Sequence, residues 1–249
     1  MRIKVIACEV LFRELSLCAA RARSEVDLVF LRQGLHANPE TLRAYVQAQV
    51  DDTDETRYQA IGLGYALCSN GVAGVRARGI PLVMARAHDC ITLLLGSKDR
   101  YAEWFSERPG TYYYSGGWIE RGDDGVPRRP EDGAGLEVSF DELVRKYGRD
   151  NAEYLWEFKS AWIKHYTHAA LIDTQLGNTE EYRCYTQRIA QERGWQYCEI
   201  AGDLSLMQAL VDGEWDEGRF LVTPPGDEIA PRVGPEIVVS VRAGAGAET

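Results

Sequence analysis

The chain has 249 residues, 45% of them hydrophobic and 27% charged, which is enough for one large α/β domain or two small ones. Its formal net charge of -10 argues against nucleic acid or an anionic membrane as a partner, because both require a basic patch. Six cysteines, no recognisable secretion signal and no apolar run of roughly 20 residues predict reduced thiols in a cytoplasmic protein.

The first hundred residues alternate between buried-strand patterns and helix-period patterns. The expected strands are residues 2–7, 26–31, 58–64 and 80–84, and the expected helices are residues 11–22, 39–50, 72–77 and 91–105. This alternation predicts a mostly parallel sheet flanked by helices on both faces, a Rossmann-like three-layer α/β architecture.

A metal ligand or nucleophile follows each expected strand. These residues are Cys8, His36, Cys68, and then His88 with Cys90. Because open α/β sheets bind ligands beyond the carboxyl ends of their strands, this edge is the predicted functional site. The remaining cysteines, Cys18, Cys184 and Cys198, fall inside helix or strand patterns.

After residue 108 the composition changes. An aromatic, glycine-containing segment precedes a charged, glycine- and proline-rich insertion at residues 121–135, and expected helices begin at Ser139 and Asn151. A second α/β series then begins at residue 169 and ends with a strand at residues 219–222. The predicted organisation is a first α/β unit (1–108), an aromatic loop with helices (109–166), a second α/β unit (167–226) and a partly disordered tail (227–249).

Three cysteines at the predicted edge suit a metal. Cys8, Cys68 and Cys90 could hold zinc with an open fourth position, or a [4Fe-4S] cluster with one iron left for substrate. His88 or His36 could complete the ligand set or act as acid or base. The helix expected after Cys90 would favour its thiolate. Catalytic thiol chemistry and inert buried cysteines are the alternatives.

Neighbouring polar residues have both a chemical and a structural interpretation. Asp89 is a candidate acid or base, or a cap for the following helix. Arg86 could bind an anionic cofactor or substrate, or form a structural ion pair. Ser69, Asn70 and Gly71 could form a backbone nest that binds an anion at a helix start.

The aromatic segment is a second candidate binding surface. Tyr112 and Trp118, with the two tyrosines between them, could form a wall of a ligand pocket above the cysteines, with Gly116 and Gly117 as a lid hinge. Core packing is the structural alternative for these side chains.

Several long motifs resemble one family. They are Cys8 with Arg13-Glu14-Leu15, Leu35-His36 before Asn38-Pro39, Gly64 to Gly71, Arg86 to Ser97, and Pro109 to Tyr112 with Gly117-Trp118. Together they resemble DUF1638, a domain family of unknown function, from residue 2 to about residue 225. Members of that family are often encoded beside corrinoid-dependent methyltransferases of the trimethylamine methyltransferase superfamily. The resemblance therefore implies one-carbon or methylamine metabolism.

The expected function is that of a cytoplasmic metalloenzyme that transfers a methyl or alkyl group to or from a small molecule. Zinc is the expected cofactor. The alternative cofactor is a [4Fe-4S] cluster, which would make the protein a redox or lyase enzyme. A non-catalytic metal or cofactor chaperone for a corrinoid protein or methyltransferase is the competing hypothesis. The cobalamin-binding pattern DxHxxG is absent around His36, which argues against a corrinoid carrier.

Overall fold

The computed structural model describes residues 1–121, 144–145, 148–149, 151–152 and 165–244. Most of the expected insertion and most of the helices expected from Ser139 and Asn151 lie outside these residues. The chain forms two compact units: unit 1 contains Met1–Ala102 and Gly202–Thr249, and unit 2 contains Glu103–Ala201. Among the helices of the described ranges, none is long and apolar enough to cross a membrane.

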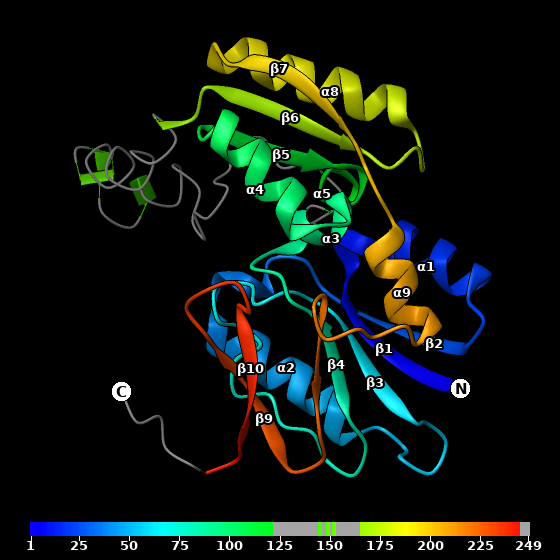
Figure 1. The fold of residues 1–249 in the computed structure, drawn as a ribbon. Helices are drawn as coiled ribbons and strands as arrows, with labels where there is room; N and C mark the ends of the chain where they lie inside the picture. The colour runs from blue at the N-terminus through cyan, green and yellow to red at the C-terminus, as the bar shows by residue number, and fades with distance from the viewer. Residues whose placement is uncertain (122–143, 146–147, 150, 153–164, 245–249) are drawn as a thin grey trace. The chain divides into compact units, whose positions relative to one another are not determined.

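Unit 1 is built on a five-stranded sheet in the order β2-β1-β3-β4-β8 (Figure 1). The strands are β1 (Arg2–Cys8), β2 (Glu25–Leu31), β3 (Ala60–Gly64), β4 (Leu82–Ala85) and β8 (Phe220–Thr223). The first four are parallel, whereas β8 is antiparallel to β4. The predicted parallel sheet over the first four strands is therefore confirmed, and their carboxyl ends share one edge.

The strand order contains a switch point. The chain passes from β1 to β2 on one side of β1, and then returns to β3 on the other side. Loops that leave β1 and β3 therefore diverge, and in open α/β sheets ligands bind at such points. Cys8 is the last residue of β1 and Cys68 lies in the loop after β3, so two predicted site residues flank the switch point.

Helix α2 (Pro39–Asp51) and a hairpin of β9 (Asp227–Pro231) with β10 (Val238–Arg242) pack on one face of this sheet (Figure 1). The predicted start of α2 is confirmed, because the Asn38 side chain accepts a hydrogen bond from the Thr41 N–H and a proline occupies the first turn. The shared core consists of Ile6, Ile61, Leu63, Leu42, Val46, Val50, Ile229 and Val238.

Helices α1 (Phe12–Arg21) and α9 (Ser205–Asp212) cover the opposite face (Figure 1). Two glycines of β3 allow them to approach. A Cβ atom on Gly64 would lie 2.8 Å from the Leu15 side chain of α1, and one on Gly62 would lie 3.4 Å from the Leu210 side chain of α9.

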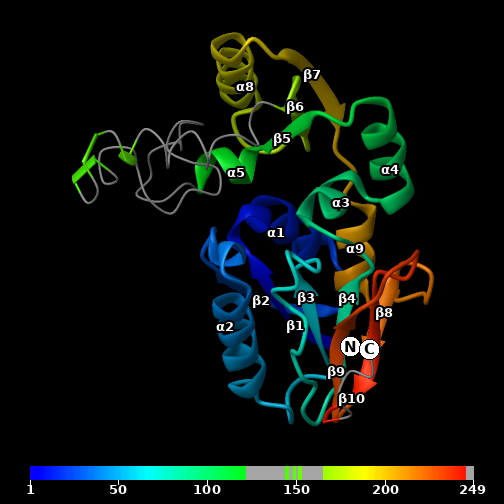
Figure 2. The same ribbon diagram turned by 90° about the vertical axis from the view of Figure 1, so that its left-hand side faces the viewer.

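The β9–β10 hairpin differs from the prediction of a partly disordered tail. It lies beside β8 (Figure 2) and buries Ile229 and Val238 in the core, which accounts for its order. The expected helix at residues 72–77 is also absent. This segment instead pairs with β9, since the Ile229 N–H donates to Val75 O at 3.0 Å and the Gly74 N–H donates to Ile229 O at 2.7 Å.

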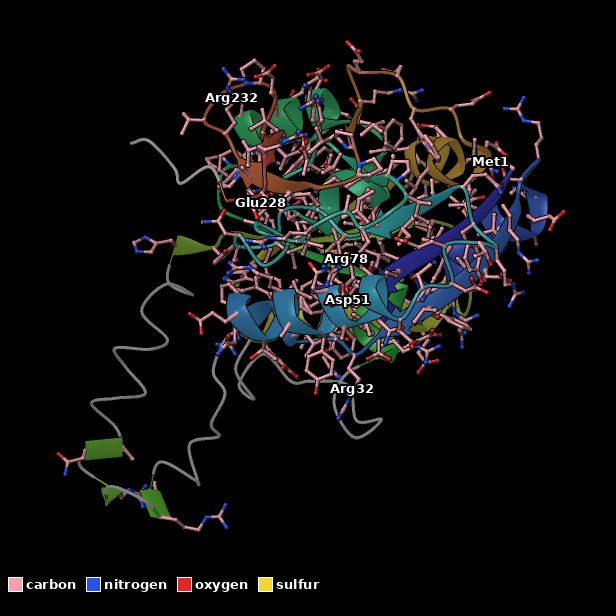
Figure 3. The ribbon with its side chains drawn as sticks, turned by 90° about the horizontal axis from the view of Figure 1, so that it is seen from below. Met1, Arg32, Asp51, Arg78, Glu228 and Arg232 are labelled. Atoms are coloured by element: carbon pink, nitrogen blue, oxygen red, sulfur yellow. The ribbon has the colours of Figure 1, made fainter. Side chains whose placement is uncertain are left out.

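Two further features lie before and after β4. Arg78, in the loop before β4, forms an ion pair of 2.6 Å with Asp51 at the end of α2 (Figure 3). The helix expected at residues 91–105 divides at Gly96, which has a φ of 73° and ends α3 (Cys90–Leu95) before α4 (Lys98–Glu107) begins.

Unit 2 contains a parallel sheet in the order β5-β6-β7. Its strands are β5 (Thr111–Ser115), β6 (His168–Asp173) and β7 (Gln196–Ala201), and its helices include α5 (Gly116–Glu120) and α8 (Thr179–Arg193). The units therefore differ from the predicted division: β5 joins the later sheet, whereas α9 and β8 return to unit 1.

Candidate functional site

Three predicted ligands follow neighbouring parallel strands at one edge of the unit 1 sheet. Cys8 ends β1, Cys68 lies in the loop after β3, and Cys90 begins α3 after β4. All three cysteines are free and of intermediate exposure as whole residues, whereas their sulfur atoms are largely desolvated. We call Cys8, Cys68 and Cys90 the thiol cluster.

Hydrogen bonds between two loops hold Cys68 near Cys90. The Leu67 N–H donates to Ala87 O at 3.0 Å, and the Cys68 N–H donates to His88 O at 2.9 Å. These bonds continue the pairing of β3 with β4 beyond the strand ends. Cys68 is therefore fixed beside the turn that leads into α3.

The turn that carries Cys68 is strained. Cys68, Ser69 and Asn70 have consecutive φ values of 47°, 55° and 66°, in the left-handed region that costs non-glycine residues roughly 1–2 kcal/mol each. Such outliers cluster at functional sites. Gly71 closes the turn by donating to Cys68 O at 2.9 Å. A Cβ atom there would lie 2.5 Å from the Leu42 side chain.

This geometry changes the predicted role of Ser69, Asn70 and Gly71. They were expected to bind an anion where a helix begins, but the described residues from Gly71 to the start of β4 form no helix. The segment instead places the Cys68 thiol at the cluster and leaves Ser69 and Asn70 exposed.

Burial makes the cluster thiols weak acids. Burial raises the pKa of Cys8 to about 11 and that of Cys68 to about 12. Burial, followed by the nearby Cys68, Asp89 and Cys8, raises the pKa of Cys90 well above its ordinary value. The expectation that the helix start favours the Cys90 thiolate is therefore wrong, because α3 has only six residues and desolvation outweighs its effect.

These pKa values predict slow alkylation of the metal-free protein at neutral pH. A thiol with a pKa of about 11 has on the order of 100-fold less thiolate than an ordinary thiol, and only thiolate reacts. We expect iodoacetamide to modify Cys8 and Cys68 far more slowly than the exposed Cys184, as measured by peptide mass spectrometry. In denaturant the three rates should converge. Fastest modification at Cys68 in the folded protein would contradict this prediction.

Tyr65 places a buried hydroxyl beside the cluster. The residue is 3% exposed, and its hydroxyl has no hydrogen-bond partner among the described residues. Its electrostatic neighbours are Cys8, Cys68 and Glu9, and burial is the main reason why its pKa is raised. The sequence prediction missed this residue. Its position directly after β3 and three residues before Cys68 was the available signal.

A second unsatisfied polar atom lies on the same edge of the sheet. The Glu9 carboxylate accepts a hydrogen bond of 2.6 Å from the Gln33 N–H, which joins the loops after β1 and β2. The Oε1 atom of Gln33 is buried and makes no hydrogen bond within the described part of the chain. Similar buried atoms without partners occur elsewhere in the described residues, so these two do not by themselves mark a ligand site.

The histidines and Asp89 have different environments. Asp89 caps α3, because its Oδ1 atom accepts from the Ile91 N–H at 3.1 Å and the Thr92 N–H at 3.3 Å. The capping interpretation is therefore confirmed. The His88 side chain is exposed, and His36 lies partly exposed in a 3-10 turn after β2. Their roles as ligand, acid or base stay predictions.

The donor chemistry of the cluster suits a soft metal, but its spacing does not form a ready ligand set. Thiols favour zinc and iron–sulfur clusters. Within the ranges that the structure describes, however, no group of three or more His, Cys, Asp or Glu side chains could hold a metal ion as it stands. Metal binding would therefore require the loops after β1, β3 and β4 to bring the thiols closer together.

A family model described as DUF1638, protein of unknown function, matches residues 30–211, which is more than half of the chain. The chain belongs to the DUF1638 family. The match contains Cys68, Cys90 and Tyr65, whereas Cys8 precedes it. No curated protein and no solved structure matches the chain. For this DUF1638 protein, functional inference therefore depends on the site itself.

In this DUF1638 protein Arg86 has a structural role. Its guanidinium donates to Glu217 O at 2.8 Å, to Glu236 O at 3.1 Å and to Val238 O. These bonds tie the end of β4 to the segment before β8 and to β10. Three backbone carbonyls therefore compete with an anionic cofactor for the Arg86 guanidinium. The sequence could not reveal these acceptors, because they lie more than a hundred positions away along the chain.

The aromatic segment packs within unit 2. Tyr114 belongs to the core between β6 and α8, and its ring lies 6.0 Å from that of Tyr185. Tyr112 stacks on Trp195 with ring centroids 6.1 Å apart. The backbone N–H of Trp118 donates to the Ser115 hydroxyl, which caps α5. Core packing thus accounts for Tyr114, and a pocket wall formed by Tyr112 and Trp118 above the cysteines stays a prediction.

Proposed function

We propose that this DUF1638 protein is a metal-dependent transferase that moves a methyl or alkyl group on a small molecule. The observation that supports it is the position of three cysteines after three neighbouring strands, at one edge of a parallel sheet. Nothing in the packing of a core requires cysteine at all three positions, whereas a soft metal requires such donors.

In this proposal the cysteines and the histidines have different roles. Cys8, Cys68 and Cys90 hold zinc, which when bound supplies a positive charge that can keep a substrate thiol as its nucleophilic thiolate. The partly buried surroundings limit access of water. His88 or His36 moves the proton, because both are partly or fully exposed near the same sheet edge.

The wider setting of the proposal comes from the family. We place the protein in the cytoplasm, in one-carbon or methylamine metabolism, with a corrinoid protein or methyltransferase as partner. We also propose that unit 1 is a variant of the three-layer Rossmann-like architecture.

A metal or cofactor chaperone is the second candidate. Among the described residues the three thiols lack a ready ligand geometry, which favours a site that exchanges its metal. A chaperone should release its zinc rapidly to a competing chelator. An enzyme should retain its zinc through turnover. An iron–sulfur cluster would instead give visible absorbance in anaerobically purified protein, where a zinc protein is colourless.

The test is metal stoichiometry in six single Cys→Ser variants, purified without chelator and without oxygen. We expect about one zinc per chain in the parent, and loss of most of it in the Cys8, Cys68 and Cys90 variants, because each removes a ligand. Variants at Cys18, Cys184 and Cys198 are the matched controls and should keep their metal. Equal metal in all six variants, or none in the parent, would refute the proposal.

A further inference from the structure

Strand β2 is an open edge of the unit 1 sheet. It pairs with β1 alone, and no described residue pairs with its outer side. The Glu25 N–H donates to Met1 O at 2.8 Å, and the backbone groups of successive residues in a strand point in alternate directions. The N–H and C=O groups of Val26, Leu28 and Phe30 therefore point away from β1. At the opposite edge of the sheet, by contrast, the β9–β10 hairpin lies beside β8 (Figure 2).

This edge lacks the features that normally prevent strands from associating. Proteins protect an exposed edge with a charge at its centre, a proline, a bulge or a very short strand. β2 has seven residues in unbroken register with β1, and its last four, Leu28 to Leu31, are all apolar and only partly buried. The Asp27 carboxylate is already engaged, because it accepts from the Arg2 guanidinium at 3.0 Å and from the Tyr58 hydroxyl at 2.7 Å. The strand is therefore suited to pair with a further strand.

Helix α1 presents a self-complementary stripe on one side of this edge. The Phe12 side chain is 39% exposed, and its ring lies 5.1 Å from that of Phe30 in β2. Ser16 and the exposed Ala20 follow at helical spacing on the same side of α1. In an antiparallel pair of α1 helices, the large Phe12 side chain of one copy therefore faces the small Ala20 side chain of the other.

Helix α2 adds a second exposed aromatic side chain on the other face of the sheet. Arg43 and Gln47 of α2 face the segment at residues 74–76, because a Cβ atom on Gly74 would lie 3.3 Å from Arg43 Nε and the Arg76 N–H donates to Gln47 Oε1 at 2.8 Å. Tyr45 lies about half a turn around the helix from both residues, and therefore on the side of β2. It is 54% exposed. The edge of β2 thus has an exposed aromatic residue on each face.

We propose that two copies of this chain associate through β2, with the two strands antiparallel about a two-fold axis at Leu28. This register pairs Val26 with Phe30 of the second copy and Leu28 with Leu28, the residues whose backbone groups point outward. The two five-stranded sheets then continue into one another, and the unpaired backbone groups of both edges gain partners. The inference does not depend on the proposed transferase function.

The charges at the ends of β2 favour this antiparallel direction. In the proposed register the exposed Arg32 side chain of one copy faces Ser24 of the other. The Ser24 hydroxyl donates to Asp212 O at 3.3 Å, and the adjacent Arg23 pairs with both Asp212 and Glu214. Two carboxylates therefore surround one guanidinium at this place, and Arg32 of the second copy meets a negative charge. A parallel pair of strands would instead place like charges opposite each other.

The experiment measures the mass of the full-length protein in solution by light scattering and sedimentation. We expect the parent to have twice the mass of one chain. Leu28→Lys and Leu28→Glu should each have the mass of one chain, because each places two like charges at the two-fold axis. An equal mixture of the two variants should recover the doubled mass, since the lysine of one copy then faces the glutamate of the other. Val222→Lys, in the exposed part of the other edge strand β8, is the matched control and should keep the doubled mass.

The outcomes test both the surface and its register. A parent with the mass of one chain would refute the proposal, whether β2 is then unpaired or pairs with another protein. A doubled mass in the separate Leu28 variants would place the contact on another surface, and a mixture that stays monomeric would exclude the two-fold axis at Leu28. Circular dichroism shows whether the variants fold. Amide hydrogen exchange of the unmodified parent gives the same test without them, because dilution should speed the exchange of Val26, Leu28 and Phe30, and unchanged rates would contradict the proposal.

Discussion

Replacing Leu42 with alanine is expected to lower the free energy of unfolding by about 2–5 kcal/mol, the usual cost of removing a fully buried leucine side chain. Leu42 of α2 is 0% exposed and packs in the core beneath the sheet. It also supports Gly71, whose hypothetical Cβ atom would lie 2.5 Å from it. Urea unfolding of the variant and the parent gives the difference.

A second measurement on the same variant links this packing to the site. Because Leu42 supports the turn that carries Cys68, its loss should increase the alkylation rate of that thiol in the metal-free protein. Leu28→Ala in the edge strand β2 is the control, since Leu28 is only partly buried and lies away from the turn. It should cost less free energy and leave the Cys68 rate unchanged. Equal effects of the two variants would argue against the supporting role of Leu42.

Gly64→Ala is expected to destabilise unit 1 by about 1–3 kcal/mol or more, as overpacking of a close-packed interior does. The added Cβ atom would lie 2.5 Å from the Ala7 Cβ atom and 2.8 Å from the Leu15 side chain, so β1 or α1 would have to move. Because β1 ends at Cys8, this shift should also weaken the zinc binding that we propose for the site. Chemical denaturation and chelator competition measure the two effects.

Gly62→Ala is the matched control for this prediction. Gly62 lies on the same face of β3, but its added Cβ atom would approach only side-chain atoms, at 3.3 Å and beyond. Those side chains, Val5 and Leu210, can adjust, so the loss of stability should be clearly smaller. Similar losses for the two glycines would show that the Ala7 approach does not limit the position of β1.

The sequence predicted the parts of the fold that depend on local patterns. Runs of apolar residues at β1 to β4 predicted buried parallel strands, and Asn38-Pro39 predicted the start of α2. Parallel strands place their carboxyl ends together, so the approach of Cys8, Cys68 and Cys90 followed from the strand positions alone. The Asp89 cap was among the alternatives for the same reason, because capping depends on neighbouring residues.

What the sequence did not predict depends on distant partners. Residues 72–77 have an apolar spacing compatible with a helix, but they pair with β9, which comes about 150 positions later. The antiparallel position of β8 beside β4 has no local signal either. Tyr65 was not singled out from the sequence, and only its three-dimensional surroundings show that its hydroxyl lacks a partner in the described chain.

Unit 2 interrupts unit 1 in the sequence, so unit 1 can complete its fold only late in synthesis. β4 ends at Ala85, but its neighbour β8 begins at Phe220, and α9 and the β9–β10 hairpin also come late. At about 5–20 residues per second, translation separates β4 from β8 by on the order of ten seconds. The cysteines of the cluster are thus all made before the elements that complete their unit. Unit 1 therefore cannot enclose these thiols until most of the chain has been made.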